Sequence, residues 1–122
     1  MLPAAHRLRR SVDFERAVRR GTRAGRSTVV VHLFLDPEED GPPQVGLVVS
    51  KAVGNAVHRN KVKRRLRHSA QRHLGALPPG ARVVVRALPP SAGATYADLD
   101  RDLDRCVERA VRRLTAPAGH GR

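Results

Sequence analysis

The 122-residue chain has a single cysteine, no tryptophan and no apolar run long enough to cross a membrane. One cysteine (Cys106) excludes a disulfide framework and a cysteine-rich metal site, and is typical of a protein from a reducing compartment. A transmembrane helix is excluded, and the basic N-terminus lacks the apolar segment of a signal peptide. With Phe14, Phe34 and Tyr96 as its only aromatic residues, the core must be aliphatic. We expect a cytoplasmic protein.

Acidic residues are also scarce: 11 Asp and Glu stand against 24 Lys and Arg, so the formal net charge is +13. Such an excess destabilises the compact state of a single domain by self-repulsion, which indicates an anionic partner. The charge is concentrated, because no Asp or Glu occurs between Gly41 and Ala97 while ten Lys or Arg do. Nucleic acid is the first candidate partner.

Hydrophobic periodicity predicts the element order α-β-β-α-β-α. The expected helices cover about 12–20, 56–74 and 96–114, and the expected strands 28–35, 44–50 and 82–86. Ser11, Asn55 and Thr95 precede the helices as candidate N-caps. We expect the first two strands to pair as an antiparallel hairpin, within a single two-layer α/β sandwich that has helices on one or both faces of the sheet. Residues 1–10 then form a basic arm, 11–114 the α/β domain that would bind the nucleic acid and 115–122 a flexible tail.

The expected helix 56–74 separates into an apolar stripe and a cationic remainder when its residues are placed at 100° intervals. The stripe holds Val62, Leu66, Ser69, Ala70 and His73, and the cations are Lys61, Lys63, Arg64, Arg65, Arg67 and Arg72. Like charges four residues apart destabilise an isolated helix by about 0.2–0.5 kcal/mol per pair. No interleaved Glu relieves them, so an anion-binding helix is favoured over a merely solvated one. The helix lies between strands and lacks a helix-turn-helix partner, which favours RNA over DNA.

Residues 46–67 resemble the signature of the protein subunit of bacterial ribonuclease P. The most specific part is Gly54-Asn55-Ala56-Val57, followed by Arg59-Asn60, Lys63-Arg64 and Arg67. Arg7-Leu8-Arg9-Arg10, Asp13-Phe14 and Arg20-Gly21 also look like that family's N-terminal region. The element order matches over about residues 6–114, so the resemblance covers nearly the whole chain.

The resemblance implies the fold of the second domain of ribosomal protein S5, in which a left-handed crossover joins two parallel strands through the basic helix. It implies a noncatalytic subunit that binds a catalytic RNA and the single-stranded 5′ leader of precursor tRNA. The RNA, with Mg²⁺, removes the leader, and the protein promotes binding of functional metal ions without binding any alone. No membrane or protein partner is expected.

The resemblance also assigns residues. RNA contact is expected from Lys51, Asn55, Arg59, Asn60, Lys61, Lys63, Arg64 and Arg67. A cleft for the leader is expected at Phe14, Val18 and His32. Here the chain departs from the family, because many members have a second aromatic at the position of Val18 and a tyrosine where His32 stands. No catalytic residue and no metal ligand is expected.

Two other functions stay open at this point: a ribosomal-type structural RNA binder and a protein-only nuclease. A nuclease needs clustered carboxylates, and those of Asp36, Glu38, Glu39 and Asp40 lie in a proline-rich loop without partners in strands. The segment 98–104 resembles a calcium loop, but Leu103 and Arg109 occupy positions that need Gly and Glu. The histidines show no zinc-ligand spacing, and Cys106 is expected in the core.

Overall fold

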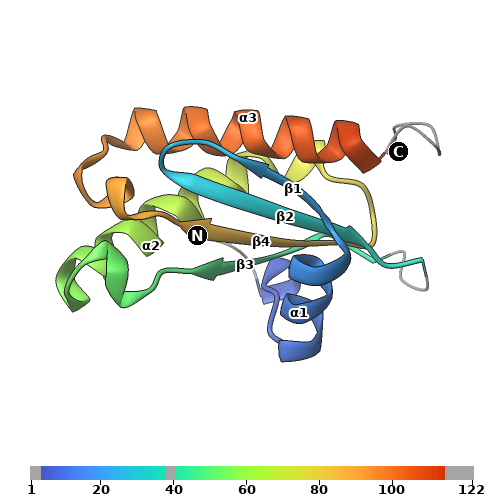
Figure 1. Cartoon of the computed structure of the whole chain (residues 1–122). Coiled ribbons are helices and arrows are strands. Elements are labelled where there is room, and N and C mark those ends of the chain that lie inside the picture. Colours follow the sequence, from blue (N-terminus) through green and yellow to red (C-terminus); the bar gives the residue numbers. More distant parts are fainter. Residues whose placement is uncertain (1–3, 38–40, 115–122) are drawn as a thin grey trace.

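The computed structural model describes residues 4–37 and 41–114, which form a mixed four-stranded sheet and the helices that cover it (Figure 1). The main elements are α1 (Ser11–Arg20), β1 (Thr22–Gly25), β2 (Val29–Leu35), β3 (Gln44–Val48), α2 (Ala56–Arg72), β4 (Ala81–Ala87) and α3 (Tyr96–Leu114). The predicted order of helices and strands is confirmed, apart from β1, a strand that the sequence did not reveal. Its four residues, which follow Gly21 and end with Gly25, form a strand too short to show an alternating pattern.

The strand order is β1-β2-β4-β3. β2 is antiparallel to both of its neighbours, whereas β3 and β4 are parallel and are joined through α2, as the resemblance implied. The predicted hairpin between 28–35 and 44–50 is therefore wrong, because β4 lies between those strands. The eight residues 36–43 include Asp40-Gly41 but form a loop too long for the two-residue turn that pairs adjacent strands. The hairpin partner of β2 is β1, across a turn at residues 26–28.

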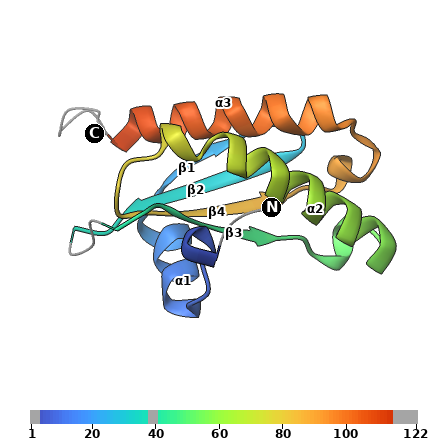
Figure 2. The ribbon, with the colours of Figure 1, turned by 180° about the vertical axis from the view of Figure 1, so that it is seen from behind.

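Helices cover both faces of the sheet. α3 and α2 pack against one face, and α1 packs against the other (Figures 1 and 2). Because side chains alternate along a strand, Val29, Val31 and Leu33 enter the main core under α3. A smaller apolar cluster lies under α1 and includes Leu8, Ala17, Val84 and the partly buried Phe14, Phe34 and Val48.

The described part of the predicted basic arm lies along the outer edge of the sheet. Arg7 forms a parallel bridge with Val45 of β3, and the Leu8 N–H donates to the Val45 carbonyl at 3.0 Å. The Leu8 side chain is buried. Residues 1–3 and the predicted tail 115–122 lie outside the described residues.

The helix starts follow the predicted caps in two cases of three. Asn55 Oδ1 accepts from the His58 N–H at 3.0 Å, and Thr95 Oγ1 accepts from the Asp98 N–H at 3.1 Å. The predicted cap Ser11 is wrong, since Ser11 is the first residue of α1 and the preceding Arg10 makes no side-chain cap bond. Gly54 has φ 151°, a conformation that favours glycine and brings the chain into α2.

Candidate nucleic-acid interface

The inner face of α2 consists of Val62, Leu66, Ser69 and Ala70, all buried as the helical periodicity predicts. His73 follows the end of the helix, and its ring nitrogens lie 3.2 Å from Asp100 Oδ1 and 3.5 Å from Asp104 Oδ1 on α3. Because the packed stripe fixes the rotation of α2, the polar side chains of the rest of its circumference must point to its flanks and to solvent.

The last turns of α2 are bound to α3 and the segment before it. Arg72 Nη1 lies 3.2 Å from Asp100 Oδ2, and Ser69 donates to the same carboxylate at 2.6 Å. Burial raises the pKa of Asp100, but hydrogen bonds from Ser69 and His73 and the nearby Arg72 outweigh it, so the pKa lies below its usual value. Arg65 donates to the Ala94 carbonyl at 3.0 Å. Arg65 and Arg72 therefore serve intramolecular contacts.

The cations of the preceding turns of α2 differ from Arg72 in having no carboxylate partner among the described residues. Lys61, Lys63, Arg64 and Arg67 form no ion pair with any acid in ranges 4–37 and 41–114, and each is exposed or half-buried. Successive residues turn by about 100°, so Lys61 lies about 200° around the helix from Lys63 and cannot share a flat contact with it. Among the described residues, these four positive charges are left without a compensating carboxylate.

The remaining predicted RNA contacts lie at the start of α2 or just before it. Lys51 is exposed in the 3-10 helix Lys51–Val53, and Asn60 is exposed on α2. Arg59 is half-buried, and its Nε has no hydrogen-bond partner. Asn55 uses its side-chain oxygen to cap the helix, which leaves its amide nitrogen for any RNA contact. That these groups touch RNA stays a prediction.

A basic hollow of about 180 Å³ lies between α2, β3 and the N-terminal segment. Its polar lining comes from Arg7, Lys63 and Arg67, and its apolar lining includes Phe14 and Leu47. The sequence placed Lys63 and Phe14 in separate sites, whereas the structure brings them to the same hollow. Arg7 was not singled out as a contact, although it begins the N-terminal motif Arg7–Arg10.

A second, more apolar hollow of about 290 Å³ separates α1 from the sheet. Phe14 and Val18 of α1 line it together with Val48 and Val84, and its charged lining residues are Glu15, Arg19 and Arg86. Phe14 lines both hollows and so forms the wall that they share. Val48 and Val84 could have been predicted as lining residues from the period-two alternation of β3 and β4 if the position of α1 had been known.

Gly46 allows this close approach of α1 to β3. A Cβ atom at Gly46 would lie 2.3 Å from Phe14 Cζ and 3.2 Å from Leu8 Cβ. The missing side chain therefore gives the Phe14 ring its place against the strand.

His32 lies on the same face of the sheet but does not line the second hollow. It pairs in register with Val84 and Arg23, is buried, and has no partner for its Nδ1. Burial, and next the charges of Arg86 and Arg23, lower the pKa of His32, which favours the neutral ring. Its predicted part in leader binding stays a prediction.

Over the described ranges, no three His, Cys, Asp or Glu side chains are grouped so as to hold a metal ion. In that same part of the chain, no helix is long and apolar enough to span a membrane. Cys106 is buried against the Val29 carbonyl, and burial raises the pKa of its thiol to about 11.

Comparison with known proteins assigns the family. The family model for ribonuclease P matches residues 2–111. A curated ribonuclease P protein component from Nocardioides sp. is 58% identical over 116 residues, covering 94% of this chain and 99% of its own length. One from Streptomyces bikiniensis is 57% identical over 118 residues, with coverage of 91% and 96%. The solved structure of the Staphylococcus aureus RNase P protein has a TM-score of 0.77 and 29% identity, covering 87% of this chain and 95% of its own. The chain therefore belongs to the family of ribonuclease P protein components.

Proposed function

We propose that the chain is the noncatalytic RNA-binding subunit of a ribonuclease P that removes the 5′ leader from precursor tRNA. Family membership supports a role in tRNA processing as part of a holoenzyme. The observation that carries the more detailed proposal is the set of cations on α2, which stay exposed or half-buried without carboxylate partners among the described residues.

The partner of α2 in this proposal is the catalytic RNA. Exposed cations without intramolecular partners can displace condensed counterions from phosphates, which is the main source of RNA affinity. A helix that contacts phosphates needs no groove-reading side chains, and this suits a folded RNA recognised by its shape. Lys63 and Arg67 on one flank and Arg64 on the outer face then bind phosphodiester groups.

The hollow between α1 and the sheet receives the single-stranded leader in this proposal. Apolar walls and a Phe14 ring suit bases, because stacking on an aromatic side chain tolerates any base and contributes about 1–3 kcal/mol per base. Arg86 lines the same hollow and can neutralise a backbone phosphate, whereas Arg19 lies 3.8 Å from the Glu15 carboxylate. Since Val18 stands where a second aromatic is common, aromatic stacking contributes less here than in many relatives.

The chemistry belongs to the RNA in this proposal, with Mg²⁺ as its cofactor. The metal ions are assigned to RNA phosphates in this proposal, as the family resemblance implies. The protein assists them by lowering phosphate repulsion and by holding the leader next to the cleavage site. The complex acts in the cytoplasm, where precursor tRNA is made.

Reconstitution tests the proposal. The catalytic RNA of the same organism is incubated with radiolabelled precursor tRNA at low Mg²⁺, with and without the protein. We expect the protein to raise the rate of leader removal, and the protein alone to cleave nothing. Leader removal by the protein alone, persisting with ribonuclease inhibitors, would contradict a noncatalytic role. Tight RNA binding without any gain in cleavage would instead favour the ribosomal-type structural binder.

A further inference from the structure

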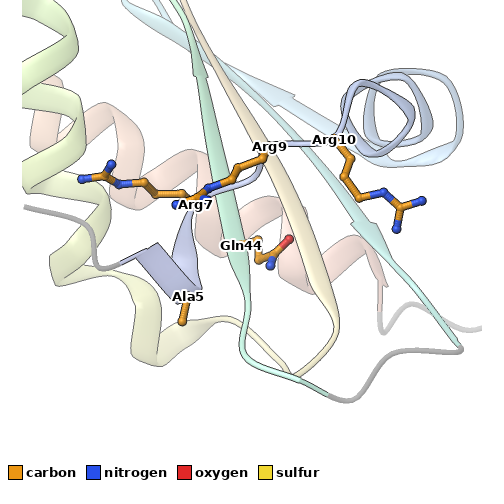
Figure 3. Close-up of a pocket in the computed structure, with 5 residues that line it drawn as sticks. All are labelled: Ala5, Arg7, Arg9, Arg10 and Gln44. Carbon is orange, nitrogen blue, oxygen red and sulfur yellow. The ribbon is translucent and has the colours of Figure 1, made fainter.

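Three arginines and a glutamine surround an open hollow on the outer edge of the sheet (Figure 3). The hollow has a volume of about 440 Å³ and is lined by Ala5, Arg7, Arg9, Arg10 and Gln44. It was not among the contacts that the family motif suggested, and it is formed by the segment before α1 together with the first residue of β3.

The backbone explains why these side chains meet. Residues 7–8 run alongside β3, and successive side chains of an extended segment point in opposite directions. Leu8 therefore turns into the core, whereas Arg7 and Arg9 turn outward. In Figure 3 the Arg7 side chain reaches toward α2, and the Arg10 side chain extends away from it. Because Arg7 also lines the hollow beside Lys63 and Arg67, the cations continue from α2 around the edge of the sheet.

The electrostatics of this cluster point to an anion. Arg9 and Arg10 are exposed and pair with no acid of the described chain, and no carboxylate is among the described lining residues. Arg7, Arg9 and Arg10 line one hollow, so their like charges add to the positive potential there. Gln44 adds an amide donor to the same hollow. A phosphate group offers several acceptor oxygens and matches the planar fork of arginine.

We propose that Arg9 and Arg10, assisted by Arg7 and Gln44, bind phosphodiester groups of the catalytic RNA and form a second RNA contact separate from α2. This inference rests on the proposed function, since it takes the same RNA as the partner. The RNA then contacts two elements, α2 and the segment before α1, whose cations Arg7, Lys63 and Arg67 meet in one hollow beside β3.

The test compares two double variants with the same loss of charge. R9A/R10A removes the proposed contact, and R105A/R109A removes two exposed arginines from α3, on the opposite face of the sheet from α1. Binding to the catalytic RNA is measured over a range of salt concentrations. We expect R9A/R10A to reduce the slope of log affinity against log salt by up to about 0.7–0.9 for each lost phosphate contact, and R105A/R109A to leave it unchanged. A third variant, R9K/R10K, retains the charges and should retain the slope.

Equal slopes for R9A/R10A and R105A/R109A would overturn the inference. Thermal unfolding checks that the variants are folded, and if R9A/R10A is not, Q44E tests the same hollow by placing a carboxylate in it. The inference would also be overturned if R9A/R10A lost affinity for a single-stranded leader oligonucleotide but not for the catalytic RNA. The inference would also be overturned if inorganic phosphate saturated the hollow, as monitored by NMR, while the affinity for the catalytic RNA was the same in R9A/R10A as in the wild type. Wild-type protein that neither binds nor activates the RNA would instead overturn the proposed function.

Discussion

Two pairs of arginines on α2 provide an internal comparison for its role. Arg64 and Arg67 have no carboxylate partner among the described residues, whereas Arg65 and Arg72 are held by the Ala94 carbonyl and the Asp100 carboxylate. R64A/R67A and R65A/R72A remove the same charge from the same helix. If partners within the protein decide which cations bind RNA, the two variants must fail in different ways.

The expected magnitudes follow from the contacts. R64A/R67A should lower the salt slope of RNA binding by up to about 1.4–1.8, which is 0.7–0.9 for each of two phosphate contacts, with little change in stability. R65A/R72A should instead lower the free energy of unfolding, by about 0.5–1.5 kcal/mol for the lost Arg65 hydrogen bond alone, and leave the slope near that of the wild type.

The assay is fluorescence anisotropy of labelled catalytic RNA titrated with each variant at several KCl concentrations, with urea unfolding run in parallel. The same fall in slope for both pairs would mean that net charge, rather than the geometry of α2, sets the affinity. An unchanged slope in R64A/R67A would remove these arginines from the interface and refute the reasoning.

Three further predictions concern the hollow under α1 and the core. V18F should strengthen leader binding by up to about 1–3 kcal/mol through one added stacking platform, measured as the difference in affinity between precursor and mature tRNA; equal gains for both would contradict it. G46A should cost about 1–3 kcal/mol of stability, because its Cβ overlaps the Phe14 ring, and chemical unfolding with m and midpoint resolved checks this. Burial raises the pKa of Asp102, but hydrogen bonds from Thr28 and Arg26 lower it by a larger amount. The pKa of Asp102 in the folded protein is therefore below that in the unfolded chain. The resulting stability is therefore present above about pH 4 and is lost as pH falls through the folded pKa; D102N should flatten this part of the pH–stability curve, and an unaltered curve would refute the assignment.

The sequence predicted most accurately those features that depend on local chemistry. The bounds of α3 match the prediction, and α2 ends two residues before the expected position. Both helices could be predicted because an apolar stripe with period 3.6 and side-chain caps are local signals. The pairing of the strands was harder to predict from the sequence. The pairing of β2 with β4 joins segments about fifty residues apart, and no turn signal in the sequence encodes that contact.

The candidate interface also has parts that the local sequence predicts and parts that only the fold reveals. Helical periodicity placed the cations of α2 outside the core, but it treated all six alike. The acids that hold Arg72 and the carbonyl that holds Arg65 belong to α3 and the residues before it, so only the fold separates them from Lys63, Arg64 and Arg67. Arg7 and Gly46 were missed as parts of a hollow for a related reason, since their partners come from α1, α2 and β3 at once.

The central claim is that α2 lies against the catalytic RNA, and directed hydroxyl-radical cleavage tests it most directly. Cys106 is buried with a raised pKa of about 11, so a cysteine introduced at the surface is the preferred site for an iron chelate. Val57 is 73% exposed on α2 and is not an expected contact, which makes V57C the probe and R105C on α3 its control. The account predicts localised strand cleavage of the RNA from V57C and little from R105C. Cleavage of similar strength and pattern from both positions, or from R105C alone, would contradict it.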